Sequence, residues 1–154
     1  MIKELPYSLG EFTQGAMYYF DHYTTDDLVR LVLNIYLANQ QKPISAIVDT
    51  GAPWCVLKPA LLEKIESRIE PIRPLDRPLY IRGTAYVGWL YHVPIRLEAI
   101  FGESLEVGAT ALIPELPPDE EWLYPNFIGL DGFLNRIRFA VDPASNLFFF
   151  GELV

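Results

Sequence analysis

Prolines and glycines are spread over the whole length of this chain, and they limit how long any helix or strand can be. The 154 residues include 13 prolines and 10 glycines. Proline interrupts the interior of helices and of central strands, while glycine favours turns. The spacing of these residues therefore divides the chain into short segments and predicts β structure with tight turns.

The apolar residues between these breaks alternate with polar ones, as they do in half-buried strands. In "LVRLVLNIYL" (28–37), one strand face carries Val29, Leu31, Leu33, Ile35 and Leu37. The loop "ANQQKP" separates this strand from a second one in "ISAIVDTGA". Together they predict a hairpin that runs into the loop beginning at Asp49.

The rest of the chain follows the same pattern. Residues 79–102 predict a long hairpin with Gly83 and Gly88 near its bend, and "SLEVGATALIP" predicts another strand. "RFAVDPASNLFFFG" predicts a closing hairpin that turns at "DPASN". Short helices are expected in "LKPALLEKIESRI", where Pro59 suits the first turn, and after Gly129 in "NFIGLDGFLNRI". The predicted fold class is therefore mostly β, with one or two short helices.

Charge and composition narrow the range of partners. The net charge of −8 and the pI near 4.7 argue against a nucleic-acid partner, because phosphate binding needs a basic face. Hydrophobic residues make up 51% and charged residues 21%, which is typical of a single globular domain. No apolar run is long enough to span a bilayer, and "MIKELPYSLGEF" does not have the pattern of a signal peptide. We therefore expect neither a nucleic-acid nor a membrane partner.

The cysteine and histidine content predicts a reducing compartment and no metal site. The single cysteine excludes an intrachain disulfide, so the cytoplasm is the expected location. His22 and His92 lie far apart in the sequence and make no metal-binding pattern with Cys55. We expect no metal and no cofactor.

The stretch "DTGAPWCVL" (49–57) permits two different chemistries. Its right half, "APWC", suggests a redox cysteine, but thiol–disulfide exchange needs a second thiol to resolve the mixed disulfide. The chain has no other cysteine, and the βαβ context of a thioredoxin-like site is missing. Cys55 is therefore predicted to be a buried packing residue, since free cysteine is among the most buried residue types.

The left half of the stretch has the local features of a carboxylate site. Asp49 follows directly on the apolar strand end Ile47-Val48, and Gly51 permits a backbone conformation that other residues disfavour. Thr50 supplies a short hydroxyl that can bond to a neighbouring loop. An ordinary Asp-Thr-Gly turn is the alternative that these three residues alone leave open.

Two motifs in order resemble the retropepsin-like aspartic proteases, the single-domain homodimeric relatives of pepsin. The first is "AIVDTGAPWCVL", and the second is "FIGLDGFL", which in the family packs behind the catalytic loop. A hairpin segment separates them, as the family's flap would, and the closing hairpin is similar to that of cellular and bacterial members. The resemblance covers residues 28–151. It implies a closed β-barrel of the acid-protease half-fold type and a protease domain over residues 28–154.

Residues 1–27 lie outside the resemblance as an N-terminal extension, either an extra packed segment or a piece removed during maturation. Two residues depart from the family pattern. Cys55 stands where Ser or Thr is frequent, and Trp54 is bulky for a position that is often small or polar. These departures bear on loop packing or specificity more than on the catalytic carboxylate.

The resemblance implies an aspartic endopeptidase that acts on peptide or protein substrates. Asp49 would be catalytic, Thr50 would hold two loops together, Gly51 would let the loop turn and Ala52 would line the floor. The mechanism needs two carboxylates, but the chain contains only one Asp-Thr/Ser-Gly motif. Asp131 is followed directly by Gly132 and is not part of such a motif. The predicted partner is thus a second copy of the chain, with the Asp dyad formed across a homodimer.

The segment 81–91 would be the flap that closes over a substrate. Tyr86, Gly88, Trp89 and Tyr91 are its candidate substrate contacts, although these aromatics would equally suit cross-strand packing. Two other functions stay open. One is a binding or dimerisation module of the same fold with little or no peptidase activity, and the other is a β-rich interaction domain in which "DTGA" is only a turn.

Overall fold

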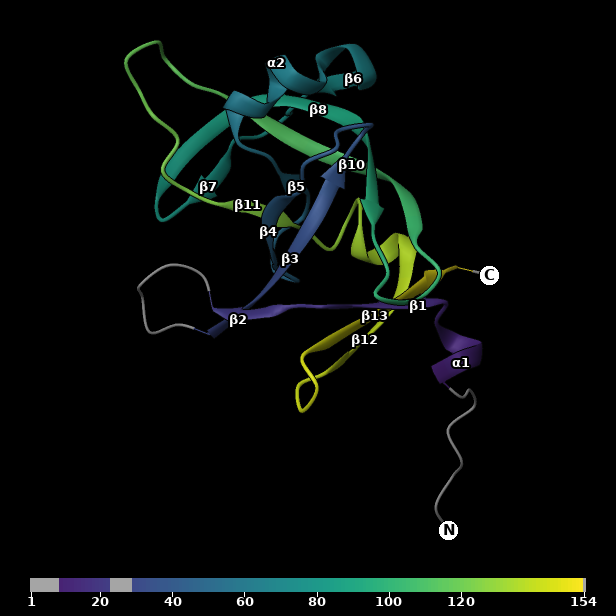
Figure 1. Cartoon of the computed structure of the whole chain (residues 1–154). Coiled ribbons are helices and arrows are strands. Elements are labelled where there is room, and N and C mark those ends of the chain that lie inside the picture. Colours follow the sequence, from purple (N-terminus) through teal and green to yellow (C-terminus); the bar gives the residue numbers. More distant parts are fainter. Residues whose placement is uncertain (1–8, 23–28, 154) are drawn as a thin grey trace.

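Six strands close into a barrel in the computed structural model, which describes residues 9–22 and 29–153 (Figure 1). Successive strands around the ring are hydrogen bonded, and the ring closes because the end of β8 returns to pair with β3. Closure satisfies the backbone groups that an open sheet would leave at its edges. In ring order the strands are β3 (Val29–Leu37), β4 (Ile44–Val48), β11 (Asn126–Ile128), β5 (Cys55–Val56), β10 (Leu105–Glu115) and β8 (Thr84–Leu97).

The longest pairing, between β8 and β10, shows why these residues form strands. On β8 the buried side chains of Val93, Ile95 and Leu97 alternate with the less buried His92 and Arg96. This is the period of two that a pleated strand imposes, so one face packs into the barrel. Three short strands extend the ring by pairing with β3 or β8: β2 (Phe20–His22), β6 (Glu70–Pro74) and β7 (Leu79–Ile81).

The bend of the predicted long hairpin lies at Arg82–Gly83, where β7 turns into β8. Ile81 pairs with Thr84, and the two residues between them have positive φ angles of 49° and 82°. The prediction that Gly88 also lies near the bend is wrong. Gly88 is buried within β8, where a Cβ atom would run into the carbonyl oxygen of Ile113 on β10. This glycine marks a close backbone approach rather than a turn.

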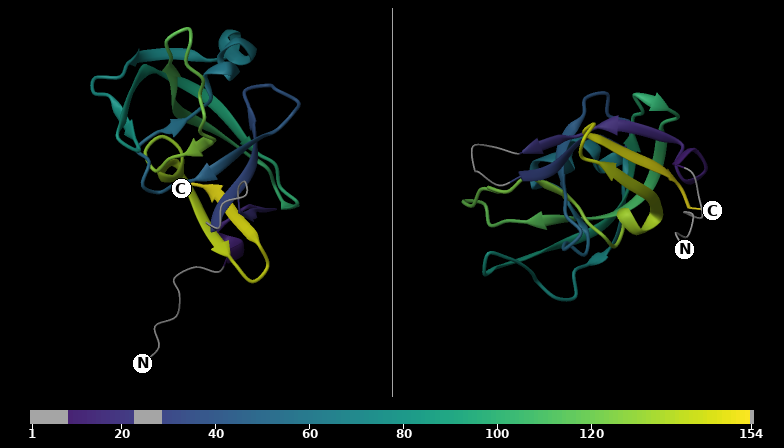
Figure 2. Two further views of the ribbon diagram at one scale, coloured as in Figure 1. Left: turned by 90° about the vertical axis from the view of Figure 1, so that its left-hand side faces the viewer. Right: turned by 90° about the horizontal axis from the view of Figure 1, so that it is seen from below.

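A second, four-stranded sheet lies beneath the barrel (Figure 1) and contains strands from both ends of the chain. Its order is β12 (Ile137–Asp142), β13 (Leu147–Glu152), β1 (Gly15–Tyr18) and β9 (Phe101–Gly102). The β12–β13 hairpin projects at the end of the molecule opposite α2 (Figure 2). The hairpin predicted for residues 138–151 is thus confirmed.

The described part of the N-terminal segment belongs to these sheets. All of β1 pairs antiparallel with β13, from Gly15 opposite Phe150 to Tyr18 opposite Leu147. Met17 and Tyr19 are buried in the same apolar core as the barrel strands. The domain boundary at residues 27 and 28 stays a prediction, and residues 1–8 and 23–28 lie outside the described residues.

Helical structure is short, as the proline and glycine spacing predicted. The segment after residue 57 that was expected to be helical contains three consecutive short helical turns. Pro59 is the first residue of the first turn. In the part of the chain described, no helix is long and apolar enough to cross a membrane. The helices are α1 (Leu9–Phe12), η1 (Pro59–Leu61), α2 (Leu62–Ile65), η2 (Glu66–Arg68) and η3 (Leu134–Arg136).

One buried amide joins three barrel segments. Asn126 on β11 is only 4% exposed. Its Oδ1 accepts the Lys58 N–H at 2.8 Å, and its Nδ2 donates to the Ser45 carbonyl oxygen at 3.1 Å. The Asn126 side chain therefore binds backbone groups of two other segments, and both of its own polar atoms have partners, as buried polar groups require.

We expect Asn126→Ala to lower the free energy of unfolding by about 2–3 kcal/mol, because it removes both side-chain hydrogen bonds, to the Lys58 N–H and to the Ser45 carbonyl oxygen. Urea denaturation followed by circular dichroism measures this loss. Ser45→Ala is the matched control, since it removes only a half-buried hydroxyl bonded to Asn34 at 3.2 Å and keeps the Ser45 carbonyl. Equal losses in the two variants would contradict the role given to Asn126.

Candidate active site

Asp49 begins a tight loop at the end of β4, and backbone groups hold its carboxylate in place. Its Oδ1 accepts the Gly51 N–H at 2.9 Å, and its carbonyl oxygen accepts the Ala52 N–H at 3.1 Å. Within the described residues no donor binds Oδ2. The half-buried carboxylate is therefore oriented through one oxygen, while the other is free to meet a water or a second carboxyl group.

β11 and the residues after it support this loop from behind. β11 runs parallel to β4, with Ile128 beside Val48, and the Asp49 N–H donates to the Ile128 carbonyl oxygen at 2.9 Å. The Leu130 N–H donates to the Ala52 carbonyl oxygen at 2.8 Å. The second motif, "FIGLDGFL", thus lies behind the Asp49 loop, as the resemblance implied, and leads into η3.

Gly129 lets the two motifs come this close. A Cβ atom at this position would collide with the carbonyl oxygen of Trp54 and lie 2.8 Å from that of Ala52. No other residue type could occupy this place without moving one of the two segments. The glycine between β11 and η3 therefore sets how closely β11 can support the loop that holds Asp49.

A cleft of about 280 Å³ opens beside Asp49, between this loop and the tip of the β7–β8 hairpin. Asp49 is the one carboxylate among the described residues that line it. In the described ranges, no three or more His, Cys, Asp or Glu side chains are grouped so as to hold a metal ion. The lining residues are Asp49, Gly51, Ala52, Pro53, Val56, Leu79, Tyr80, Ile81, Arg82 and Phe127.

Sequence reasoning located only part of this lining. Asp49, Gly51 and Ala52 do lie at the cleft, whereas Thr50 is exposed and makes no side-chain hydrogen bond to a described residue. The hairpin contributes through 79–82, and of these residues only Ile81 and Arg82 fell within the predicted flap. Gly83 favours a turn, and this was the sequence signal that could have placed the hairpin tip at Arg82–Gly83.

The four predicted flap contacts do not line the Asp49 cleft. Gly88 is buried in β8 opposite Pro114 of β10, Tyr91 is half-buried against the core, and Trp89 is 37% exposed on β8. Tyr86 packs away from the cleft. Contact of these four residues with a substrate stays a prediction.

Tyr86 belongs to an aromatic cluster that ties the base of the hairpin to the loop after β10. Its ring meets those of Trp122 and Tyr124 edge to face, at centroid distances of 5.0 and 6.0 Å. A side-chain hydrogen bond with Tyr124 is the main cause that raises the pKa of Tyr86 above its usual value. The indole Nε1 of Trp122 is buried without an acceptor among the described residues. The cluster is therefore a packed support for the hairpin.

Cys55 is a core residue, and the prediction that it packs as a small apolar side chain is confirmed. It is fully buried on β5, opposite Ala111 of β10. Burial raises the pKa of the thiol to about 11, although the Gly129 backbone and the charge of Arg136 act in the opposite direction. A neutral, inaccessible thiol is a poor nucleophile.

Two solved structures share this architecture. One is a retropepsin-like aspartic protease from Rickettsia conorii, with a TM-score of 0.52 and 15% identity over 89% of this chain and 91% of that one. The other is the retroviral protease-like domain of Ddi1 from Leishmania major, with a TM-score of 0.51 and 16% identity over 83% of this chain and 97% of that one. The chain has the retropepsin-like fold.

This result comes from structure rather than from sequence. The sequence matches no protein-family model, and it matches no curated protein sequence. The predicted fold class is nevertheless confirmed, as a mostly β retropepsin-like barrel with a few short helices. The alignment with the Rickettsia protein covers 89% of the chain, which is more than residues 28–154 make up. It therefore includes part of the N-terminal segment.

We expect Gly129→Ala to destabilise the chain by about 1–3 kcal/mol, since the added methyl group overpacks the contact with Trp54. Thermal denaturation measures the loss. Gly10→Ala is the matched control, because nothing lies within 4 Å of a Cβ atom there and alanine suits a helix. A Gly129 variant as stable as the Gly10 variant would contradict the proposed packing.

We expect the Cys55 thiol of the folded chain to resist alkylation at pH 8, where only about one thiol in a thousand is ionised when the pKa is near 11. Unfolding exposes the thiol and returns its pKa to the ordinary range, so alkylation then becomes fast. Mass spectrometry after iodoacetamide treatment, with and without denaturant, measures the difference. Rapid labelling of the folded chain would show that the thiol is accessible.

Proposed function

We propose that this protein is an aspartic endopeptidase that cuts peptide bonds with a water molecule activated by a pair of Asp49 carboxylates. The observation that carries the proposal is the position of Asp49. Asp49 lines a cleft, on a loop that is hydrogen bonded to β11 and in which no described donor binds Oδ2. The retropepsin-like fold supports the same reaction class.

In this mechanism, two carboxylates share one proton because like charges at short distance cannot both ionise easily. The ionised carboxylate takes a proton from the water, whose oxygen attacks the carbonyl carbon of the peptide bond. The protonated carboxyl group donates its proton to the carbonyl oxygen. When the C–N bond of the tetrahedral species breaks, the amine takes the proton that the first carboxyl group received from the water. One hydroxyl group of the species returns a proton to the second carboxylate, which leaves a carboxylic acid and restores the shared proton.

The second carboxylate would come from a second copy of the chain. Asp49 is the one carboxylate among the described residues at the cleft, so a single chain supplies half of the pair. Thr50 is exposed beside it, with a hydroxyl that no described residue binds and that could bond to the counterpart loop across a two-fold axis. A C₂ homodimer is the simplest assembly that brings two identical loops together.

The β7–β8 hairpin would act as the flap over a peptide substrate. Its tip already forms one wall of the cleft, with the apolar side chains of Leu79 and Ile81 opposite the Asp49 loop. A hairpin in this position can exclude water and hold an extended peptide. The lone cysteine favours a reducing compartment, and the cytoplasm is therefore the proposed location.

We expect Asp49→Asn to abolish cleavage of unfolded peptides, because the amide can neither take a proton from water nor share one with its partner. Cleavage is measured with fluorogenic peptides, and analytical ultracentrifugation checks that the variant still dimerises. Asp131→Asn is the matched control, since Asp131 is exposed and bonded to Asn135 at 3.3 Å rather than placed in the cleft.

Loss of activity in the Asp49 variant alone, with the dimer intact, would support the dyad. Unchanged cleavage by Asp49→Asn would contradict the mechanism. A wild-type dimer that binds peptides without cutting any would instead identify a binding or dimerisation module of the same fold. A wild-type chain that stays monomeric and still cuts would contradict a site shared between two copies.

A further inference from the structure

Arg82 stands at the tip of the β7–β8 hairpin and lines the same cleft as Asp49. Its φ of 49° lies in the left-handed region, in a two-residue turn with Gly83. Such turns favour Asn, Asp or Gly at this position, because the Cβ atom of most other residues makes positive φ unfavourable. A residue held in a disfavoured conformation at a functional site is a sign that its side chain has a use there.

No described residue pairs with the Arg82 guanidinium. Other arginines of the chain have partners: Arg136 donates to the Gly108 carbonyl oxygen and the Thr110 hydroxyl, and Arg96 lies 4.6 Å from the Tyr36 ring. Arg82 therefore brings to the edge of the cleft a charge and up to five N–H donors that no described residue binds.

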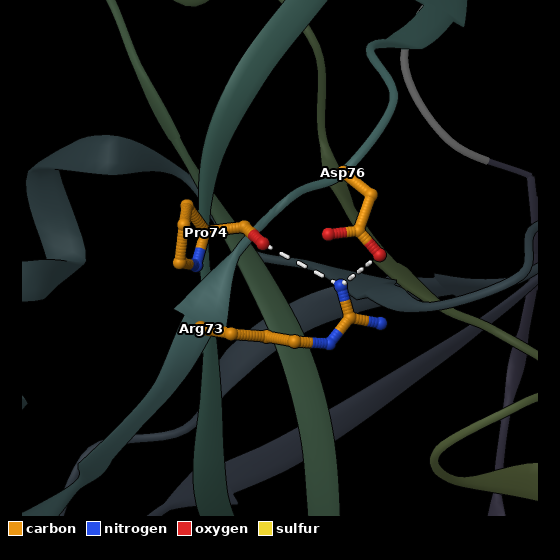
Figure 3. A network of polar contacts seen from close by, with 3 residues as sticks. All are labelled: Arg73, Pro74 and Asp76. Carbon is orange, nitrogen blue, oxygen red and sulfur yellow. Dashed lines mark hydrogen bonds and ion pairs between the residues drawn. The ribbon is translucent and has the colours of Figure 1, made fainter.

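A second hollow of about 270 Å³ continues the cleft and adds to this charge. It shares Pro53 and Leu79 with the Asp49 cleft, so the two adjoin, and Arg77 lies on its wall. Asp76 is the acidic residue in this hollow, and it already binds Arg73 at 2.9 Å (Figure 3). Arg77 is exposed and without a described partner.

The segment from Arg73 to Gly83 consequently carries three arginines against one aspartate, in a chain whose net charge is −8. A local positive potential beside an apolar cleft attracts ligands of opposite charge. Guanidinium groups bind carboxylates through two parallel hydrogen bonds, which adds direction to the attraction.

We propose that Arg82, with Arg77 further along the groove, selects peptide substrates that carry a glutamate or aspartate a few residues from the bond that is cut. The inference rests on the proposed peptidase function and names its substrate class. The substrate has apolar side chains at the scissile bond, where Leu79, Ile81 and Phe127 line the cleft. Its acidic side chain pairs with Arg82 at the hairpin tip.

The test uses matched peptides with an apolar pair at the centre and Glu, Gln or Lys placed two, three or four residues to either side. The ratio of kcat/KM for Glu over Gln peptides is measured with the wild-type chain. We expect Glu to be preferred by about 1.5-fold to fivefold at its best position, the range for an exposed charge pair. The preference falls as salt is raised.

Arg82→Asn is the decisive variant, because asparagine suits the left-handed turn while removing the charge. Its Glu to Gln ratio is expected to fall to about one, whereas Arg82→Lys keeps most of the preference. Arg68→Gln is the matched control, since Arg68 is exposed but lines neither hollow, and it keeps the wild-type ratio. Thermal denaturation verifies that each variant is folded.

Binding of the same peptides to Asp49→Asn, measured by fluorescence anisotropy, separates selection from cleavage. Cleavage with a Glu to Gln ratio that Arg82→Asn leaves unchanged would overturn this inference and leave the proposed function standing. Arg82-dependent binding of Glu peptides without any cleavage by the wild type would support the selection and overturn the peptidase. Neither cleavage nor binding of any peptide would overturn both.

Discussion

The parallel contact between β4 and β11 is the constraint on which the rest of the site depends. These strands come from segments far apart in the sequence, and their pairing brings the Ile128 carbonyl oxygen to the Asp49 N–H. Parallel neighbours cannot be joined by a tight turn, so the intervening chain must travel around the barrel before it returns. That path builds β5, β8 and β10, which enclose the core. The geometry at Asp49 is thus a product of the whole ring.

The positive charge and the apolar wall of the cleft come from a different part of the chain than the Asp49 carboxylate does. The Asp49 loop supplies a carboxylate held by backbone hydrogen bonds, whereas the β7–β8 hairpin supplies an apolar wall and the guanidinium of Arg82, which no described residue binds. The aromatic contacts of Tyr86 with Trp122 and Tyr124 link the base of this hairpin to a proline-rich loop. A support of this kind limits how far the base of the hairpin can move, while the exposed tip has fewer constraints.

Local patterns in the sequence predicted most of the strands and the position of Asp49, because alternation and turn chemistry are local properties. The buried face of β8 and the burial of Cys55 also followed from residue type alone. Contacts between segments far apart in the chain produce no local pattern in the sequence, so they were not predicted. Glycine is typical of turns, yet Gly88 lies within a strand, where it lets the backbones of β8 and β10 come close together. Asparagine is common in loops, yet Asn126 binds the backbone of two other segments, and only the closed ring creates both situations.

The pairing of β1 with β13 also determines the order in which the chain can fold. β1 precedes every strand of the barrel in the sequence and β13 follows every one of them, but the two lie side by side over their whole common length. During synthesis β1 must therefore wait, unpaired along that edge, until the last strand has been made. Contacts of such sequence separation slow folding, since a large loop has to close before they can form. The lower sheet is for this reason the last part of the molecule to become complete, and it joins the two ends of the described chain once the barrel strands have been made.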